Sequence, residues 1–171
     1  MTTATRPNFT SLDAARNWVM EERWRDGVTC PCCDQLAKVY RRPLNYGMAH
    51  CLFLMYDYFN QPGHERCWLH LPSYLNGRGV VARGGDPTKT RYWGLIVGSG
   101  DVREDDSPRV GHWRITEKGV AFVEQRITVP SHALVYNDQC LGFSEEQVLI
   151  SKCLGKRFDY AKLMATTRRP H

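Results

Sequence analysis

The cysteine-rich run Cys30-Pro31-Cys32-Cys33 has the residue types and the spacing of a metal site. Cys30 and Cys33 stand three positions apart, and a tight turn of this length lets two thiolates bind one tetrahedral Zn²⁺ ion. The run does not lie between a strand and a helix in a thioredoxin-like unit, so redox chemistry is the weaker interpretation. Zn²⁺ is therefore the candidate cofactor, with Cys30 and Cys33 as its candidate metal ligands.

A structural zinc site needs two further ligands, and the sequence has no second CxxC. The candidates are His50 and Cys51, or the cluster His64-x-x-Cys67-x-x-His70. The alternative is that the cysteines are buried small residues and the histidines are solvated loop residues. The sequence leaves both interpretations open.

A second run, Thr88-Lys89-Thr90-Arg91-Tyr92, has the character of a helix that enters the major groove of DNA. Such a helix presents short polar and cationic side chains, which reach base edges and phosphates. Arg91 is the best candidate for a guanine contact, because its planar guanidinium can donate hydrogen bonds to both O6 and N7. The alternative is a packing helix with Tyr92 and Trp93 in the core. Three further cations are candidate DNA contacts: Arg103, Arg109 and Arg114.

Local signals predict that a helix over residues 86–94 carries this second run. Asp86 can cap a helix, and Pro87 has the φ angle of the first helical position. Gly94 ends the helix, since glycine takes the left-handed conformation at little cost. Residues 95–97 are bulky and apolar, so they predict a strand after it.

A wing and a capped helix are predicted to follow that strand. Residues 98–111 hold Gly, Ser, Pro and charged residues without an apolar period, so they predict a loop. Residues 112–115 suit the return strand of a hairpin whose tip is the wing. Thr116 with Gly119 is a partial capping pattern, and Val120, Val123 and Ile127 recur at helical spacing behind it.

The order of these elements is similar to that of winged helix-turn-helix DNA-binding domains. The run Arg-Tyr-Trp-Gly-Leu-Ile over residues 91–96 resembles the end of the recognition helix in multiple-antibiotic-resistance-type repressors. The run Trp-Arg-Ile-Thr-Glu-Lys-Gly-Val-Ala-Phe over residues 113–122 resembles their strand-to-helix return. The resemblance covers roughly residues 45–127 and implies a winged-helix fold that binds DNA.

The same signals divide the chain into three predicted regions. Residues 1–44 hold a helix over 10–26, stopped by Gly27, then the CxxC knuckle and a strand over 35–44. Residues 45–127 form the winged-helix core. Its central helix over 45–60 is apolar nearly all round, and a short strand over 68–71 and a short helix over 72–75 follow.

Residues 128–171 are predicted to be an appendage packed on the core. They hold a hairpin that turns at Asn137-Asp138, since both residues tolerate positive φ. Helices over 144–154 and 158–164 follow it. The predicted fold class is therefore α+β, with a winged helix-turn-helix core, an N-terminal helix plus CxxC knuckle, and a C-terminal β-hairpin and helix appendage.

The composition is that of an ordinary globular protein, with 42% hydrophobic and 24% charged residues. The net charge of +5 permits nucleic-acid binding without requiring it. Seven cysteines is an odd number and no secretory leader precedes them, so we expect a reducing cytoplasm rather than a disulfide scaffold. The longest apolar run, over residues 51–56, is far too short to span a bilayer, and no membrane partner is expected.

The sequence thus predicts a sequence-specific double-stranded DNA-binding protein, a transcriptional or replication regulator that reads the major groove with the helix 86–94. Two features count against DNA. Residues 72–119 hold eight Lys or Arg against six Asp or Glu, a net charge of only +2. The wing carries Asp101, Glu104, Asp105 and Asp106, which would repel phosphate. The alternative is a winged-helix protein-docking module, an adaptor or inhibitor without DNA binding, whose partner is another protein or a second copy.

No enzyme is predicted. The sequence lacks a nucleophile elbow, a phosphate loop, a two-His metalloprotease helix and a deaminase pattern. Gly77-x-Gly79-x-x-Ala82 formally matches a dinucleotide fingerprint, but its context is wrong. No buried strand leads into it, and Gly84-Gly85-Asp86-Pro87 breaks the helix that should follow.

Overall fold

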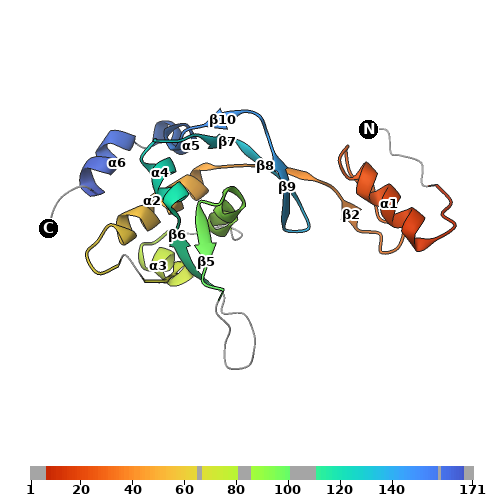
Figure 1. Ribbon diagram of the computed structural model, residues 1–171, viewed down its shortest axis with the longest axis horizontal. Coiled ribbons are helices and arrows are strands. Elements are labelled where there is room, and N and C mark those ends of the chain that lie inside the picture. The colour runs from red at the N-terminus through yellow and green to blue at the C-terminus, as the bar shows by residue number, and fades with distance from the viewer. Residues whose placement is uncertain (1–6, 65–66, 81–85, 101–110, 158, 168–171) are drawn as a thin grey trace, which may run out of the picture. The chain divides into compact units, whose positions relative to one another are not determined.

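The computed structural model describes residues 7–64, 67–80, 86–100, 111–157 and 159–167 (Figure 1). The chain is α+β, with helices and small antiparallel sheets. It divides into two compact units. The first combines the chain up to Arg42 with His132–Phe143, and the second combines Pro43–Ser131 with the chain from Ser144 onward. The hairpin predicted as part of the appendage therefore belongs with the N-terminal region.

The first unit begins with helix α1 (Leu12–Glu22), which is shorter than the predicted 10–26. The Ser11 side chain accepts a hydrogen bond from the Ala14 backbone N–H at 3.1 Å, so Ser11 caps the helix. Strands β1 (Val28–Thr29) and β2 (Leu36–Ala37) form an antiparallel hairpin. The small core of this unit packs Val19 of α1 against the hairpin.

A three-stranded sheet of order β3–β8–β9 completes the first unit. The predicted strand over 35–44 is two strands, β2 and then β3 (Tyr40–Pro43). Strands β8 (His132–Tyr136) and β9 (Gln139–Phe143) form an antiparallel hairpin, as predicted. Its turn residues Asn137 and Asp138 have φ of +47° and +58°, the conformation that a two-residue hairpin turn of this type requires.

The second unit is built around helix α2 (Tyr46–Phe59). The predicted cap is confirmed, because the Asn45 side chain accepts from the Met48 backbone N–H at 3.0 Å. The helix is buried nearly all round, so it is the centre of the core rather than an amphipathic surface helix. Its buried residues are Met48, Ala49, Cys51, Leu52, Phe53, Leu54, Met55, Tyr56 and Phe59.

The elements around α2 follow in the predicted order. They are strand β4 (Leu69–His70), helix α3 (Leu71–Gly77), helix η1 (Asp86–Trp93), strand β5 (Ile96–Gly98) and strand β6 (His112–Ile115). The three strands form one antiparallel sheet with β6 in the middle, in the order β4–β6–β5. Figure 1 shows β5 and β6 side by side, next to α3.

Helix η1 begins at the predicted Asp86, and it is a 3₁₀-helix. Helix α4 (Glu117–Val123) begins at the predicted place, and the Thr116 hydroxyl accepts from the Gly119 backbone N–H at 3.0 Å. The helix ends before Ile127, which was expected to belong to it.

The end of the second unit differs from the predicted helix over 144–154. Strand β7 (Val129–Pro130) pairs with strand β10 (Gln147–Val148), and helix α5 covers only Ile150–Leu154. The chain then continues through η2 (Gly155–Arg157) and α6 (Tyr160–Thr167). Within the described residues, no helix is both long and apolar enough to cross a membrane.

Candidate functional site

Helix η1 turns one of its three sides toward the core. A 3₁₀-helix has three residues per turn, so positions i, i+3 and i+6 lie on one side. Pro87, Thr90 and Trp93 are that side, and all three are buried. The Thr90 side chain is 1% exposed, and its hydroxyl donates to the Pro87 carbonyl at 2.8 Å. Thr90 is therefore a packing residue, and its predicted contact with DNA is wrong.

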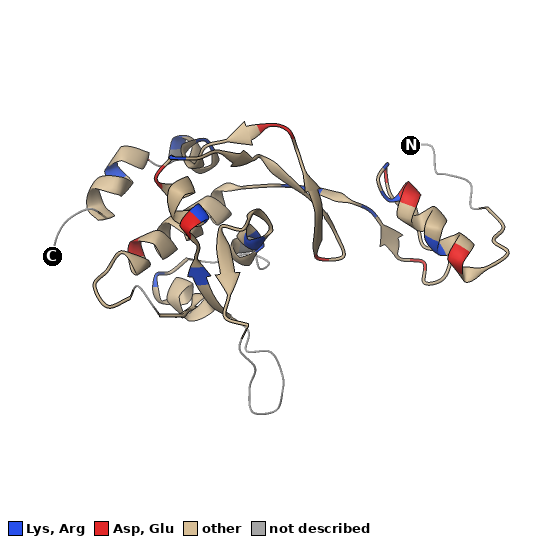
Figure 2. Cartoon of the chain, viewed as in Figure 1, with Lys and Arg blue, Asp and Glu red and all other residues tan. Residues whose placement is uncertain are grey.

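The other two sides of η1 carry the remaining candidate residues. Thr88 and Arg91 share one side, and Lys89 and Tyr92 share the other, and all four are partly exposed. The Arg91 guanidinium lies 4.7 Å from the centre of the Tyr92 ring, and its Nη1 donates to the Thr88 carbonyl at 3.4 Å. Figure 2 shows a blue, basic stretch on this helix, which lies beside strand β5. The helix thus presents two cations beside an aromatic ring.

The end of η1 is fixed by Gly94, as predicted. Gly94 has a φ of +69°, and its backbone N–H donates to the Arg91 carbonyl at 2.9 Å. The Gly94 carbonyl accepts from the Thr116 hydroxyl at 2.7 Å. Trp93 is 1% exposed and its indole N–H donates to the Pro130 carbonyl at 2.6 Å, so this residue anchors the helix in the core.

A third partly exposed cation lies on the sheet. Arg114 of β6 is paired in register with Val97 of β5, and its guanidinium lies 5.4 Å from the centre of the Trp68 ring. Trp68 is 37% exposed and Val97 is 46% exposed. Sequence reasoning named Arg114 but not Trp68. The strand alternation around Leu69, which is buried, was the available signal that its neighbour Trp68 faces outward.

Two histidines lie beside this surface. His70 and His112 are register partners on β4 and β6, with ring centres 4.9 Å apart. His70 Nδ1 is 2.7 Å from the Ser73 hydroxyl, which holds the ring in place. These rings extend the aromatic surface next to the base of the predicted wing.

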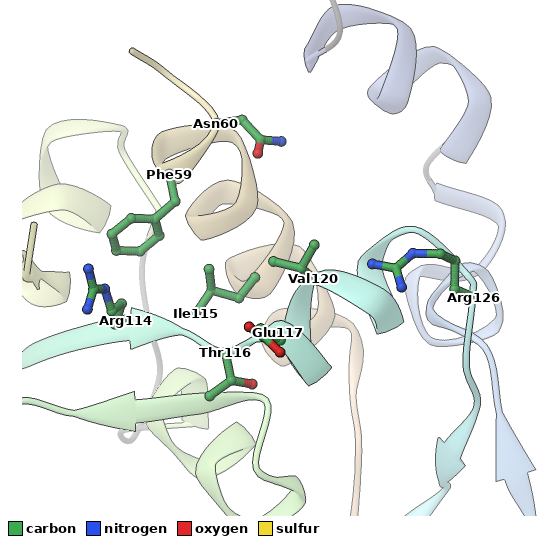
Figure 3. A pocket seen from close by; sticks show the side chains of 8 residues that line it. All are labelled: Phe59, Asn60, Arg114, Ile115, Thr116, Glu117, Val120 and Arg126. Atoms are coloured by element: carbon green, nitrogen blue, oxygen red, sulfur yellow. The ribbon is translucent and has the colours of Figure 1, made fainter. Parts of the chain in front are cut away.

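An open pocket of about 410 Å³ lies on the second unit (Figure 3). Arg114 and Arg126 stand on either side of Val120, and the carboxylate of Glu117 lies between them (Figure 3). The Arg126 Nε–H donates a hydrogen bond to the Glu124 carboxylate at 2.6 Å. This mixture of charges resembles a solvated groove more than a site for one charged ligand. Its lining is Phe59, Asn60, Arg114, Ile115, Thr116, Glu117, Val120 and Arg126.

The wing itself is outside the described residues. Arg103 and Arg109, both predicted DNA contacts, fall in this stretch. The acidic residues Asp101, Glu104, Asp105 and Asp106 also fall there. Their roles remain sequence-based predictions.

The cysteine run forms the tip of the β1–β2 hairpin. The Cys30 backbone N–H donates to the Gln35 carbonyl at 2.8 Å, and the Asp34 N–H donates to the Cys30 carbonyl at 3.0 Å. Asp34 has a φ of +56°, which turns the chain back. Hydrogen bonding from the backbone N–H groups of Cys32 and then Cys33, with a smaller effect of the Cys33 side chain, lowers the pKa of the Cys30 thiol. The turn therefore brings Cys30 and Cys33 together and favours a thiolate at Cys30.

The proposed partner ligands belong to the second unit, where they have contacts of their own. Cys51 lies in the buried helix α2, and burial raises the pKa of its thiol to about 12, so in this structure it packs in the core. His50 stacks on Tyr46 at 5.6 Å between ring centres, and burial lowers its pKa.

The cluster around His64 does not form a site either. His64 stacks on Tyr58 at 4.2 Å, and its Nδ1 lies 3.1 Å from the Tyr58 carbonyl. The Cys67 thiol donates to the Gly63 carbonyl at 3.6 Å, and His70 contacts Ser73 instead. Across the described ranges, no three His, Cys, Asp or Glu side chains gather as a metal site would require.

No protein family, curated protein or solved structure matches this chain.

Proposed function

We propose that the second unit is a winged helix-turn-helix domain that binds double-stranded DNA as a transcriptional or replication regulator. One observation carries the proposal. The described elements run α2, β4, α3, η1, β5 and β6, and β6 lies between β4 and β5 in the sheet. A winged helix has this order, with a recognition helix between its second helix and its hairpin. Helix η1 occupies that position.

The exposed sides of η1 supply the contacts in this proposal. Arg91 is the candidate for guanine, because a guanidinium can donate two hydrogen bonds to O6 and N7. Lys89 and Thr88 suit phosphate or base edges, and Tyr92 holds the Arg91 side chain by its ring face. Arg114 on the sheet is the third cation, and Arg103 and Arg109 of the wing extend the basic surface by sequence alone. Thr90 is no longer included, since it is buried.

The length of η1 suits a short recognition helix. Eight residues at about 2.0 Å per residue give a helix of roughly 16 Å, and a 3₁₀-helix is narrower than an α-helix. A helix of this width is narrow enough to enter a major groove about 12 Å wide. Its two cationic sides would face a short stretch of bases rather than an extended site.

The test is the affinity of Arg91→Ala for genomic DNA fragments, measured by gel shift at 50 and 200 mM salt. If Arg91 reads guanine, affinity should fall by about 5- to 150-fold on the preferred sequence and hardly change on others. Arg25→Ala is the matched control, because Arg25 is a well-exposed arginine of the first unit. If the unaltered chain binds no DNA at low salt, the proposal is wrong. Equal weakening on all sequences would make Arg91 a phosphate contact.

A protein-docking module is the second candidate, and the surface around Trp68 favours it. Trp68 and Arg114 lie together with Val97 exposed beside them. Tryptophan and arginine are enriched at the centres of protein interfaces, where they supply most of the binding energy. The acidic wing suits a basic protein partner better than phosphate.

Neutralising the acidic residues of the wing distinguishes DNA binding from protein docking. The triple change Glu104→Gln, Asp105→Asn, Asp106→Asn removes negative charge in a segment predicted to be a loop. On DNA, affinity should rise, because repulsion of phosphate is lost. A basic protein partner should instead bind more weakly and associate more slowly. No change in either assay would leave residues 98–110 without a functional role.

A further inference from the structure

Strand β3 presents basic and aromatic side chains together at the edge of a sheet. It is an outer strand of the sheet β3–β8–β9, and all four of its residues are exposed. Successive side chains of a strand point to opposite faces, so Tyr40 and Arg42 share one face and Arg41 lies on the other. The Arg42 guanidinium is 5.4 Å from the centre of the Tyr40 ring, which agrees with a shared face. The strand thus offers a ring and two cations to solvent.

Positive charge is concentrated at this strand, although the unit is neutral as a whole. The described part of the first unit, residues 7–42 and 132–143, holds six Lys or Arg and six Asp or Glu. Three of these cations, Lys38, Arg41 and Arg42, lie within five positions, and residues 35–56 include no Asp or Glu (Figure 2). Within the residues that the structure describes, none of the three forms an ion pair. Their charge is therefore available to an anionic ligand.

The end of α1 brings two further rings to this part of the unit. The Val39 backbone N–H donates to the Arg23 carbonyl at 2.8 Å, so the residue before β3 lies against the residue after α1. The Arg23 guanidinium lies 4.4 Å from the centre of the Tyr136 ring and 5.9 Å from that of Trp24. Trp24 is 48% exposed and Tyr40 is 45% exposed. Two large rings next to the basic strand are thus open to a ligand.

Arg23 itself is a buried cation that has no carboxylate partner among the described residues. Its side chain is only 8% exposed, and its Nη1 donates to the Met20 sulfur at 2.6 Å. In the described ranges its Nε has no hydrogen-bond partner. A buried charge without an opposite charge is costly, and ring faces compensate for only part of that cost. An anion bound at this surface would therefore be favoured by Arg23 as well as by the exposed cations.

A single strand of nucleic acid has the chemistry that matches this combination. Its phosphates need cations, and its unpaired bases can stack on aromatic side chains. In a duplex the base faces are already stacked on one another, so exposed rings find no such partner there. Lys and Arg on an edge strand also deter pairing with another strand, but that role needs no exposed rings. A protein partner would use the rings too, but the centres of protein interfaces are depleted in charged residues.

We propose that the first unit binds single-stranded nucleic acid along β3. Lys38, Arg41 and Arg42 bind the phosphates, and Tyr40 and Trp24 stack on bases. Because β3 lies at the edge of its sheet, long cationic side chains from both of its faces can reach a backbone that follows this edge. Every base has an aromatic face, so the binding tolerates many sequences. The site is separate from η1, and it goes beyond the proposed reading of duplex DNA without depending on it.

The test is fluorescence anisotropy of the full chain with labelled oligo(dT) and with an abasic oligomer of the same length. Tyr40→Leu should weaken oligo(dT) binding by about 5- to 150-fold, which is the contribution of one stacked base, and should leave abasic binding unchanged. Tyr40→Phe keeps the ring and is the matched control, so it should keep the affinity for oligo(dT).

The cations are tested by the salt dependence of the same binding. Arg41→Ala and Arg42→Ala should weaken binding of both oligomers. Each should lower the slope of log affinity against log salt by about 0.7, the value for one phosphate contact on a single strand. Arg16→Ala, which removes an exposed arginine of α1 in the same unit, is the matched charge control and should change neither the affinity nor the slope.

The unaltered chain keeps the test decisive if a variant fails to fold. Equal affinity for oligo(dT) and the abasic oligomer would overturn the proposal, because the rings would then contribute nothing. No binding of oligo(dT) at low salt, or tighter binding of polyglutamate than of oligo(dT), would also overturn it, the latter in favour of an acidic protein partner. Tyr40→Leu should keep duplex binding and Arg91→Ala should keep oligo(dT) binding, so either proposal can fail alone. Loss of oligo(dT) binding in Arg91→Ala, with Tyr40→Leu unaffected, would assign the single strand to η1 instead.

Discussion

Cys51 and Cys30 are the same type of residue in opposite surroundings. Cys51 is 2% exposed in α2, and burial raises the pKa of its thiol to about 12. Cys153 follows the same pattern, with its pKa raised to about 11 by burial. Backbone N–H groups lower the pKa of Cys30 instead. Metal binding needs the thiolate, so the tip of the hairpin is suited to it and the core cysteines are not.

Gly119 shows a residue whose importance lies in having no side chain. It was noted in the sequence only as the third position after the Thr116 cap. In the structure, a Cβ on Gly119 would run into the Leu95 carbonyl oxygen and would lie 2.7 Å from Ile115 Cγ1. The glycine lets α4 approach the strand before it, so the Thr-Glu-Lys-Gly sequence is explained by packing as well as by capping.

Gly119→Ala should therefore destabilise the second unit. Because the obstacle is backbone, which cannot turn aside, we expect a loss of roughly 1–3 kcal/mol in the free energy of unfolding. Chemical denaturation followed by tryptophan fluorescence measures it. Gly47→Ala is the control within the same unit, since the nearest atom to its Cβ is 3.5 Å away and the position is helical. A Gly119→Ala variant as stable as the Gly47→Ala variant would contradict the packing account.

At the scale of elements, the features set by neighbouring residues could be predicted from the sequence. The Asn45 and Thr116 caps are side chain to backbone contacts three residues apart. The Asn137-Asp138 turn depends on the φ preference of two adjacent residues. Strand β6 has the predicted bounds, because it lies between the predicted 98–111 loop and the Thr116 cap, which define its two ends.

Elements that depend on contacts between residues far apart in the sequence could not be predicted from local signals. Residues 144–149 carry a helix-start signal, but the Ser131 N–H donates to the Glu146 carbonyl at 2.7 Å and β7 takes β10 as a partner. The type of η1 depends on a period of three rather than 3.6, which eight residues cannot distinguish. Alternation could suggest that Trp68 is exposed, but its position beside Arg114 depends on the pairing of β4 with β6.

The Gly94 turn gives a test at this scale, because it ends η1 and starts β5. No atom lies within 4 Å of a Cβ built on Gly94, so its φ of +69° is the whole obstacle to substitution. We expect stability to fall in the order Asn, Ala, Val, with roughly 1–2 kcal/mol lost for Gly94→Val. Asparagine tolerates the left-handed conformation, and β-branched valine does not. Equal melting temperatures for Gly94→Asn and Gly94→Val would show that this turn is not needed.

At the scale of the whole molecule, the chain enters the first unit twice. Residues up to Arg42 form most of it, and His132–Phe143 return to it after the second unit has been crossed. Strand β8 lies between β3 and β9, so the returning segment is part of the sheet and not an attachment to it. If the chain is divided by sequence order alone, this hairpin is grouped with the C-terminal helices. Strand pairing between distant segments is what local signals cannot show.

Hydrogen exchange can show which segments open together. Amides that open in one cooperative step exchange at one free energy, and such groups follow three-dimensional units rather than sequence. We expect amides of β8 and β9 to exchange with those of β1 and β2, and faster than those of α2, whose residues are buried nearly all round. Strands β7 and β10, which flank the hairpin in sequence but belong to the second unit, should exchange with α2. Exchange of β8 and β9 together with β7 and β10 would contradict the two-unit division.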